Sequence, residues 1–209
     1  MLRTAALVLA AGRGVRFGRP GKLMVPLDGQ PILQHVLDAV FGAGTVLTVV
    51  VMGNEAESME HELRWRGELR VRNPAPEDGL SGSLRLGMQA VEGADPGGEL
   101  EAVLVVLGDQ PRARAQVMHD LMAAGTANPR RPIVVPRYRD GAGSHPVLLR
   151  RSVWPLALAA RGDRGIGQAI AARPDLVVEV PFPGANPDID TPADLAAIAG
   201  DLTKPPAAT

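Results

Sequence analysis

The chain has 209 residues, of which 45% are hydrophobic, 22% charged and 3% aromatic, and its formal net charge is −1. This is the balance of a globular protein with a buried core, and the length fits one domain. The near-zero charge gives no electrostatic reason to expect nucleic-acid or membrane partners. Because the chain has no cysteine, disulfides, thiolate metal sites and a cysteine nucleophile are excluded. The apolar run 5–11 is too short to span a bilayer, and we expect a cytoplasmic protein.

In the first half of the chain, β-branched runs alternate with amphipathic stretches. Strands are predicted at 4–9, 45–52 and 69–71, where apolar residues form short runs. A loop rich in Gly, Arg and Pro occupies 12–21. Helices are predicted from Pro31 until Gly42 and Gly44 end the pattern, and then over 55–65 and 83–91, with Ser81 or Gly82 near the N-cap of the last.

The second half contains the strongest predicted strand, 102–107, which ends abruptly at Gly108-Asp109-Gln110-Pro111. A helix over 113–124, strands over 133–136 and 146–149, helices over 152–160 and 164–172, and a strand over 176–180 follow. Thr191 and Pro192 are the predicted N-cap and first residue of a C-terminal helix. We expect residues 1–202 to form the domain and 203–209 to be a disordered tail.

This order of elements predicts a single-domain, three-layer α/β/α fold, Rossmann-like, with a mostly parallel sheet. Ligands of such sheets bind at the carboxyl ends of the strands, near the point where the strand order reverses. The loops 11–22, 74–83 and 108–111 are therefore the candidate binding segments.

The first motif is Leu-Ala-Ala-Gly-x3-Arg-x-Gly-x3-Lys over residues 9–22. Small residues after a buried strand let the backbone approach a ligand, and successive N–H groups can bind an anion. Arg16 and Lys22 can add charge-assisted contacts to a triphosphate. A Walker loop is excluded because Leu23, rather than Ser or Thr, follows Gly21-Lys22. The alternative is a surface loop without a ligand.

The second and third motifs carry carboxylates. Asp109 follows the strongest strand, where its side chain would point into the ligand cleft, although Gly, Asp and Pro are also common in turns. Asp188 and Asp190 alternate with Ile189 and so share one side of an extended segment, although one of them could simply cap the next helix. Asp109 and Asp190 together would make a two-carboxylate site for Mg²⁺, with Mn²⁺ as a possible substitute.

The remaining candidates are polar groups beside glycines. Asn73, Gly79 and Ser83 could hydrogen-bond a base or ribose, although ordinary helix capping also explains them. His145, in Gly143-Ser144-His145-Pro146, could line an acceptor pocket, although a single His at a strand start is more often structural.

Taken together, the motifs resemble the signature of nucleotidyltransferases of the molybdenum-cofactor family, and most of all its cytidylyltransferase branch. The resemblance is carried by residues 9–22, Gly108-Asp-Gln-Pro111, Gly-x-His-Pro-Val-Leu at 143–148 and Asp188-Ile-Asp-Thr-Pro192. Ala-Ala-Gly at 10–12 favours that branch, since the guanylyl branch reads Ala-Gly-Gly. Gln110 stands where the family has Met.

The resemblance implies a nucleotide-diphospho-sugar transferase type of fold and a role for each matched residue. Arg16 and Lys22 would hold the triphosphate and act in catalysis with Asp109, while Gly12 and Gly14 leave room for it. Metal ligation would come from Asp109 and Asp190, and His145 would face the acceptor phosphate. The base would be bordered by Ala10, Ala11, Gly79 and Ser83.

The implied reaction is transfer of CMP from CTP to the phosphate of molybdopterin, with release of pyrophosphate. A molybdoenzyme or its chaperone would be the partner that receives the product. Two alternatives remain open within the transferases: guanylylation, and a sugar- or alcohol-phosphate acceptor. From another class, a non-catalytic nucleotide-binding accessory protein in molybdoenzyme maturation would have the same motifs without needing Asp109.

Overall fold

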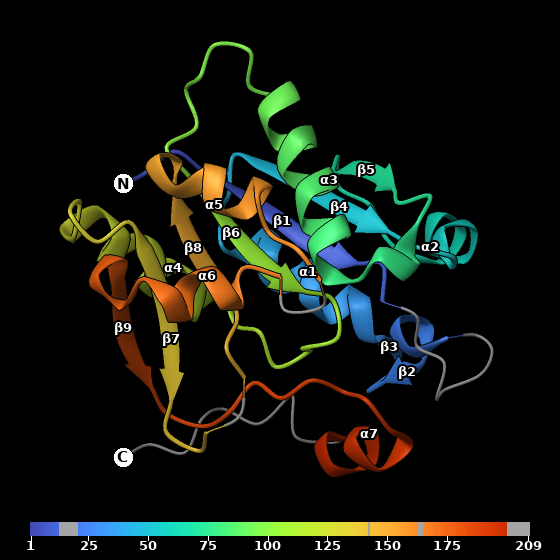
Figure 1. Cartoon of the computed structure of the whole chain (residues 1–209). Helices are drawn as coiled ribbons and strands as arrows, with labels where there is room; N and C mark the ends of the chain where they lie inside the picture. The colour runs from blue at the N-terminus through green and yellow to red at the C-terminus, as the bar shows by residue number, and fades with distance from the viewer. Residues whose placement is uncertain (13–20, 142, 163–164, 200–209) are drawn as a thin grey trace.

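A seven-stranded sheet with the order β5-β4-β1-β6-β8-β7-β9 organises the protein (Figure 1). It is seen in a computed structural model that describes residues 1–12, 21–141, 143–162 and 165–199. All neighbouring strands are parallel except the two pairs that involve β8. The strands are β1 (Thr4–Ala10), β4 (Leu47–Met52), β5 (Leu69–Arg72), β6 (Ala102–Leu107), β7 (Ile133–Tyr138), β8 (Val147–Arg150) and β9 (Val177–Phe182).

Helices cover both faces of this sheet (Figure 1). One face packs against α1 (Ile32–Gly42) and α4 (Ala115–Ala127), the other against α3 (Leu80–Gly93) and α5 (Trp154–Leu158). All seven residues of β1 are buried, because its alternate side chains enter two different cores. A strand buried on both faces reads as a continuous apolar run. The predicted three-layer α/β/α fold with a mostly parallel sheet is confirmed. The other helices are α2 (Ala56–Glu62), α6 (Gly167–Ala172) and α7 (Pro192–Ile198).

Differences from the sequence prediction are local. Helix α3 begins at Leu80 with Gly79 as its N-cap, three residues before the predicted start, so the expected cap at Ser81 or Gly82 is wrong. The glycine adopts φ 81°, which disfavours any residue with a Cβ atom. The helix predicted over 55–65 ends at Glu62, and the one over 152–160 begins with a 3-10 turn.

A small hairpin before α1 was missed. Strands β2 (Pro26–Leu27) and β3 (Gln30–Pro31) pair antiparallel across Asp28-Gly29. Both turn residues have positive φ, 47° and 87°, as a two-residue hairpin turn requires. The Asp-Gly pair was the available signal. Because the flanking strands have only two residues each, the sequence has no alternating apolar pattern that would predict the hairpin.

The strand order reverses between β1 and β6, since β4 and β5 lie on the other side of β1. Leu9 is paired with Leu107, and Ala10 with Met52, so these strands end at the same edge of the sheet. The Gly108 N–H donates to the Leu9 carbonyl at 3.0 Å across this point. A crevice at such a reversal is where open α/β sheets bind ligands.

No helix among the described residues is long and apolar enough to cross a membrane. The predicted domain boundary at residue 202 and the predicted tail 203–209 lie outside the described residues.

Candidate active site

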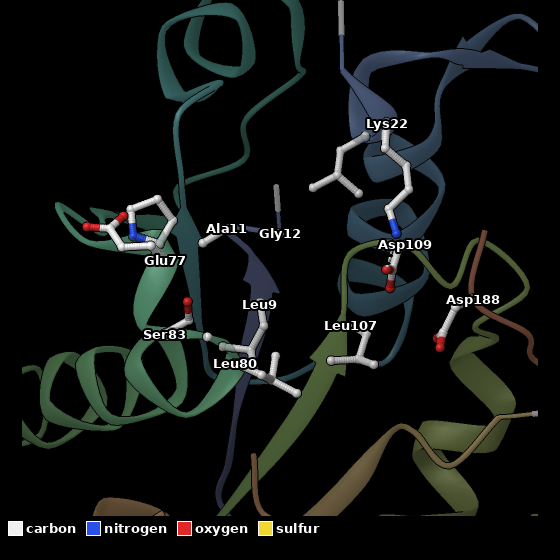
Figure 2. A pocket seen from close by; sticks show the side chains of 13 residues that line it. Leu9, Ala11, Gly12, Lys22, Glu77, Leu80, Ser83, Leu107, Asp109 and Asp188 are labelled. Atoms are coloured by element: carbon white, nitrogen blue, oxygen red, sulfur yellow. Dashed lines mark hydrogen bonds and ion pairs between the residues drawn. The ribbon is translucent and has the colours of Figure 1, made fainter. Parts of the chain in front are cut away.

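A cavity of about 520 Å³ opens at the carboxyl ends of β1 and β6 (Figure 2). Its volume is within the range of small-molecule sites, roughly 300–1,000 Å³. Strand ends, the loop before α3 and the first turn of that helix supply its walls. The lining residues are Leu9, Ala11, Gly12, Lys22, Leu23, Pro76, Glu77, Gly79, Leu80, Ser83, Leu107, Asp109 and Asp188.

The two ends of the cavity differ in chemistry. Figure 2 shows Leu80 and Ser83 on one side of the end of β1, and Lys22 and Asp109 on the other. The first end offers apolar surface and a hydroxyl, with the exposed Glu77 at its outer edge, and the second offers opposite charges. A ligand that fits both ends has an uncharged, flat or apolar part joined to a charged part.

The hydroxyl at the uncharged end is held by a buried amide. The Asn73 side-chain Nδ2 donates to Ser83 Oγ at 3.0 Å, while the Ala75 N–H donates to Asn73 Oδ1 at 3.0 Å. The backbone donor thus fixes which way the amide faces. Since Ser83 Oγ accepts from Asn73, its own hydrogen is left to be donated elsewhere. Helix capping does not explain Ser83, because Gly79 is the N-cap.

At the charged end, one ammonium group joins two distant carboxylates. Lys22 Nζ lies 2.6 Å from Asp109 Oδ2 and 3.0 Å from Asp190 Oδ1. Burial alone would lower the pKa of Lys22, but the charges and hydrogen bonds of both aspartates outweigh it, so the pKa is raised. The ammonium is therefore fully protonated at neutral pH.

The segment that carries Asp190 is tied to the loop of Asp109. The Ile189 N–H donates to the Asp109 carbonyl at 3.0 Å, and the Ile189 side chain is fully buried. The next helix is capped by Thr191, which forms a capping box with Asp194. Neither Asp188 nor Asp190 is the cap, which removes the structural alternative that the sequence left open. The predicted N-cap at Thr191, with Pro192 in the first turn, is confirmed.

Asp188 faces the cavity from the same segment. Gln110 Nε2 donates to Asp188 Oδ1 at 2.7 Å. Desolvation by the surrounding protein raises the pKa of Asp188, as does the nearby negative charge of Asp109. Asp188 therefore differs from Asp190, which contacts the ammonium of Lys22 directly.

The donor chemistry fits a hard divalent cation. Because Asp109 and Asp190 contact the same nitrogen atom, their oxygens lie no farther apart than the sum of those two contacts. Carboxylate oxygens are the ligands that Mg²⁺ and Mn²⁺ prefer. Within the described part of the chain, no group of three or more His, Cys, Asp or Glu side chains could hold a metal. Substrate oxygens or water would have to complete the coordination, as is common for Mg²⁺.

A buried amide pair connects this segment to the loop before β8. Asn186 Nδ2 donates to Gln110 Oε1 at 2.9 Å and to the His145 carbonyl at 3.1 Å. The backbone of Gly143 (φ 95°) lies so close to Asn186 that a Cβ there would approach its carbonyl oxygen to 2.2 Å. Gln110 therefore connects Asp188 with Asn186, and Asn186 in turn contacts the 143–146 loop. Sequence analysis missed Asn186, because a lone Asn in a Pro- and Gly-rich stretch has no distinguishing pattern.

His145 belongs to that loop rather than to the cavity wall. Its side-chain Nδ1 lies 3.2 Å from Ser144 Oγ, and the Tyr138 hydroxyl donates to its carbonyl at 3.2 Å. The residue as a whole is half-buried, and the protein around the imidazole is dense enough that burial lowers its pKa to about 4. The ring is therefore neutral near pH 7. Its predicted contact with an acceptor remains a prediction.

The structure brings most of the candidate residues to one place. Ala11, Gly12, Lys22, Gly79, Ser83 and Asp109 line the cavity, and Asp190 reaches it through Lys22. Ala10 does not line it, because strand alternation turns its side chain into the core beside α1. Gly14 and Arg16 lie outside the described residues. Hydrophobic lining residues such as Leu80 and Leu107 were missed, since nothing distinguishes them from core residues in the sequence.

Residues 6–177 match the family model described as the MobA-like NTP transferase domain. The chain belongs to this family. A curated relative, the bifunctional protein GlmU of Pelobacter propionicus, is 30% identical over 125 residues, which cover 59% of this chain and 26% of GlmU. GlmU of an Exiguobacterium strain is 30% identical over 146 residues, 69% of this chain and 31% of that protein. The chain thus spans about a quarter to a third of the length of these curated relatives.

Solved structures share the fold over nearly the whole chain. Rv0371c of Mycobacterium tuberculosis is 27% identical with a TM-score of 0.82, covering 94% of this chain and 97% of that one. A manganese complex of the same protein gives 24% identity, a TM-score of 0.80, and coverage of 95% and 99%. CMP:2-keto-3-deoxy-manno-octonic acid synthetase complexed with CTP gives 14% identity, a TM-score of 0.66, and coverage of 94% and 96%. The fold is that of the nucleotide-diphospho-sugar transferases, and residues 6–177 form a domain of the NTP transferase family.

Proposed function

We propose that the protein transfers CMP from CTP to the phosphate of molybdopterin and releases pyrophosphate, with Mg²⁺ or Mn²⁺ bound by Asp109 and Asp190. The observation that carries this proposal is the meeting of both carboxylates at Lys22, beside the cavity at the end of β1. Two carboxylates 81 positions apart in the chain meet beside a lysine, which provides cation ligands and a positive charge for a metal-assisted attack on a phosphate.

The nucleoside would occupy the uncharged end of the cavity. Pro76 and Leu80 offer apolar surface to a base, and the free hydroxyl hydrogen of Ser83 suits an acceptor atom. Cytosine has two such acceptors on its pairing edge, O2 and N3. The CTP complex of a protein with the same fold supports a cytosine nucleotide, and Ala-Ala-Gly at 10–12 supports the same base.

The triphosphate would then lie toward Lys22, with the backbone of Gly12 beside it. An oxygen of the acceptor phosphate attacks the α-phosphorus, the bond from that phosphorus to the bridging oxygen breaks, and pyrophosphate leaves with the electron pair. A divalent cation supplies charge neutralisation at the phosphate oxygens where negative charge grows. The manganese complex of the similar mycobacterial protein supports such a cation. Lys22 stabilises the leaving pyrophosphate, and the cavity walls hold the reactants in line.

The acceptor would approach from the side of the 143–146 loop. That loop is fixed against Asn186 and so has a defined position relative to Asp188 and Asp190. His145 is neutral near pH 7, which suits donation or acceptance of a hydrogen bond rather than an ion pair with a phosphate. A molybdoenzyme or its chaperone would take the product.

The test is an incubation with each of the four NTPs, Mg²⁺ or Mn²⁺, and molybdopterin, in which pyrophosphate release is measured. We expect release that requires CTP and molybdopterin together. Parallel reactions with a sugar 1-phosphate as acceptor cover the nearest alternative. Faster release with GTP would indicate guanylylation, and release with the sugar phosphate alone would replace the proposed acceptor.

The Asp109→Asn variant separates the enzyme from a non-catalytic accessory protein. The substitution keeps the size of the side chain but removes the negative charge needed for the cation, so we expect near-complete loss of pyrophosphate release. An accessory protein would still support molybdoenzyme maturation in cells with Asp109→Asn. Full complementation by that variant would contradict the proposed function.

A further inference from the structure

Lys22 occupies the position between the two carboxylates that the proposed cation needs. Its ammonium nitrogen contacts Asp109 Oδ2 at 2.6 Å and Asp190 Oδ1 at 3.0 Å, and its side chain is only 10% exposed. The two oxygens come from chain segments 87 and 168 residues away from the lysine. One ammonium group thus forms ion pairs with both carboxylates.

The surroundings of Lys22 are acidic. Besides its two direct partners, the carboxylate of Asp188 faces the same end of the cavity. The carboxylate of Glu55 lies against Gly21, leaving no room for a Cβ there, and it is close enough to Lys22 to interact electrostatically with the ammonium. Withdrawing the ammonium would leave these carboxylates close together without a countercharge, which is unfavourable in a partly buried site.

A divalent cation and the ammonium cannot share these oxygens. A metal ion bound by Asp109 and Asp190 needs the lone pairs that now accept hydrogen bonds from Nζ, and the two positive charges repel each other. A free ion must therefore break the ion pairs that Lys22 forms with both carboxylates in a partly buried position. When the ion arrives with a triphosphate, the phosphate oxygens offer the ammonium new charge-assisted partners.

We propose that Lys22 acts as an internal counterion that excludes a free divalent cation from the two-aspartate site and admits one that arrives with a nucleoside triphosphate. This inference rests on the proposed function, because it assumes the same two metal ligands. By linkage, the cation and the nucleotide then strengthen each other's binding. The lysine selects the metal–nucleotide complex over the bare metal, in addition to stabilising the leaving group.

The test measures Mn²⁺ binding to the full chain without nucleotide, from the electron paramagnetic resonance signal of free Mn²⁺. Lys22→Met removes the charge and keeps an apolar stem of similar length. We expect Lys22→Met to bind Mn²⁺ about tenfold more tightly than the unchanged protein, equivalent to about 1.4 kcal/mol. Affinity equal to or weaker than that of the unchanged protein would overturn the inference.

Three controls distinguish displacement of the Lys22 ammonium by the metal ion from a general electrostatic effect on Mn²⁺ binding. Lys22→Arg keeps the charge and should not tighten Mn²⁺ binding. Arg137→Met removes a positive charge from an exposed site on β7 and should also have no effect. In the double variant Lys22→Met with Asp190→Asn, the gain over Asp190→Asn alone should be smaller, because the ammonium then competes with the ion only for the carboxylate of Asp109.

The same titration distinguishes failure of this inference from failure of the proposed function. Equal Mn²⁺ affinity in all Lys22 variants, with Asp190→Asn still weaker, refutes the counterion role and leaves the metal site in place. If neither the unchanged protein nor Lys22→Met binds Mn²⁺ at millimolar concentration, and CTP does not change this, both proposals are wrong. Thermal melting followed by circular dichroism checks that Lys22→Met and Lys22→Arg are both folded under the conditions of the Mn²⁺ titration.

Discussion

The two sides of the cavity are held together by different means. On the side of β1 and α3, the walls are strand ends, glycines and the first turn of a helix, which come from separate strand–helix units packed against each other. On the side of Asp190 and the 143–146 loop, position depends on side-chain amides that join segments 76 and 41 residues apart. The first side follows from the packing of regular strands against their covering helix, and the second from side-chain hydrogen bonds between loops.

This difference has a consequence for mutations. Substitutions of ligand-contacting groups on the β1 side should change nucleotide binding or chemistry without moving other residues. Substitutions in the amide pair should act at a distance, through the position of Asp188, Asp190 and the acceptor loop. The following variants test this contrast.

The largest effect is expected for Asp190→Asn compared with Asp188→Asn. Asp190 contacts Lys22, whereas Asp188 is held by Gln110, so only the first should be a metal ligand. We expect Asp190→Asn to lower kcat about 10³-fold or more, and Asp188→Asn to stay within about tenfold of the unchanged enzyme, by pyrophosphate release.

Asp175→Asn is the matched control, because Asp175 is an exposed carboxylate paired with Arg173. It should leave turnover unchanged. A larger loss for Asp188→Asn than for Asp190→Asn would transfer the metal role to Asp188.

The second effect concerns Lys22→Ala. If the ammonium stabilises charge mainly as the bond to pyrophosphate breaks, kcat should fall on the order of 10²-fold with a smaller change in KM for CTP. Steady-state kinetics at varied CTP measures both. Normal turnover with only a weakened nucleotide affinity would show that Lys22 merely binds the substrate.

The third effect is expected for Asn186→Ala. Loss of its two hydrogen bonds frees Gln110 and the 143–146 loop, so we expect KM for the acceptor to rise about tenfold while KM for CTP changes little. Asn128→Ala is the control, since that amide also donates to a carbonyl but at the end of α4. An equal rise in both KM values would mean that Asn186 supports the whole domain rather than the acceptor side.

The smallest effect is a pH dependence of stability from His145. Its folded-state pKa of about 4 lies below the ordinary 6.5, so the unfolded chain takes up a proton first as the pH falls. The stability that the neutral ring contributes is complete above pH 6.5 and is lost progressively between pH 6.5 and 4. The slope is at most about 1.4 kcal/mol per pH unit.

Urea unfolding between pH 7.5 and 4.5 measures this dependence. His145→Gln should flatten the curve in that window, and His61→Gln, at an exposed position on α2, should not. An unchanged slope in His145→Gln would show that the ring is protonated equally in both states.

The sequence by itself determined the layers of the fold and the β1 side of the site. Nearly continuous apolar runs such as 4–10 predict strands that are covered on both faces, because such strands have few polar positions. Glycines then predict the backbone turn that follows. Lys22 was predicted from its glycine-rich motif, whereas Gly79 and Ser83 were assigned to the base through the family resemblance. Asp109 and Asp190 were predicted from their motifs to form a two-carboxylate site, and the resemblance implied the same pair.

Only the tertiary structure showed how the chain forms the side of the cavity with Asp190 and the 143–146 loop. That Ile189 hydrogen-bonds to Asp109, that Asn186 joins Gln110 to the His145 carbonyl, and that Lys22 lies between two aspartates are facts about segments far apart in sequence. Such contacts depend on strand order and on the antiparallel insertion of β8 between β6 and β7. Periodicity and spacing are local properties, and they carry no information about which distant amides and charges will meet.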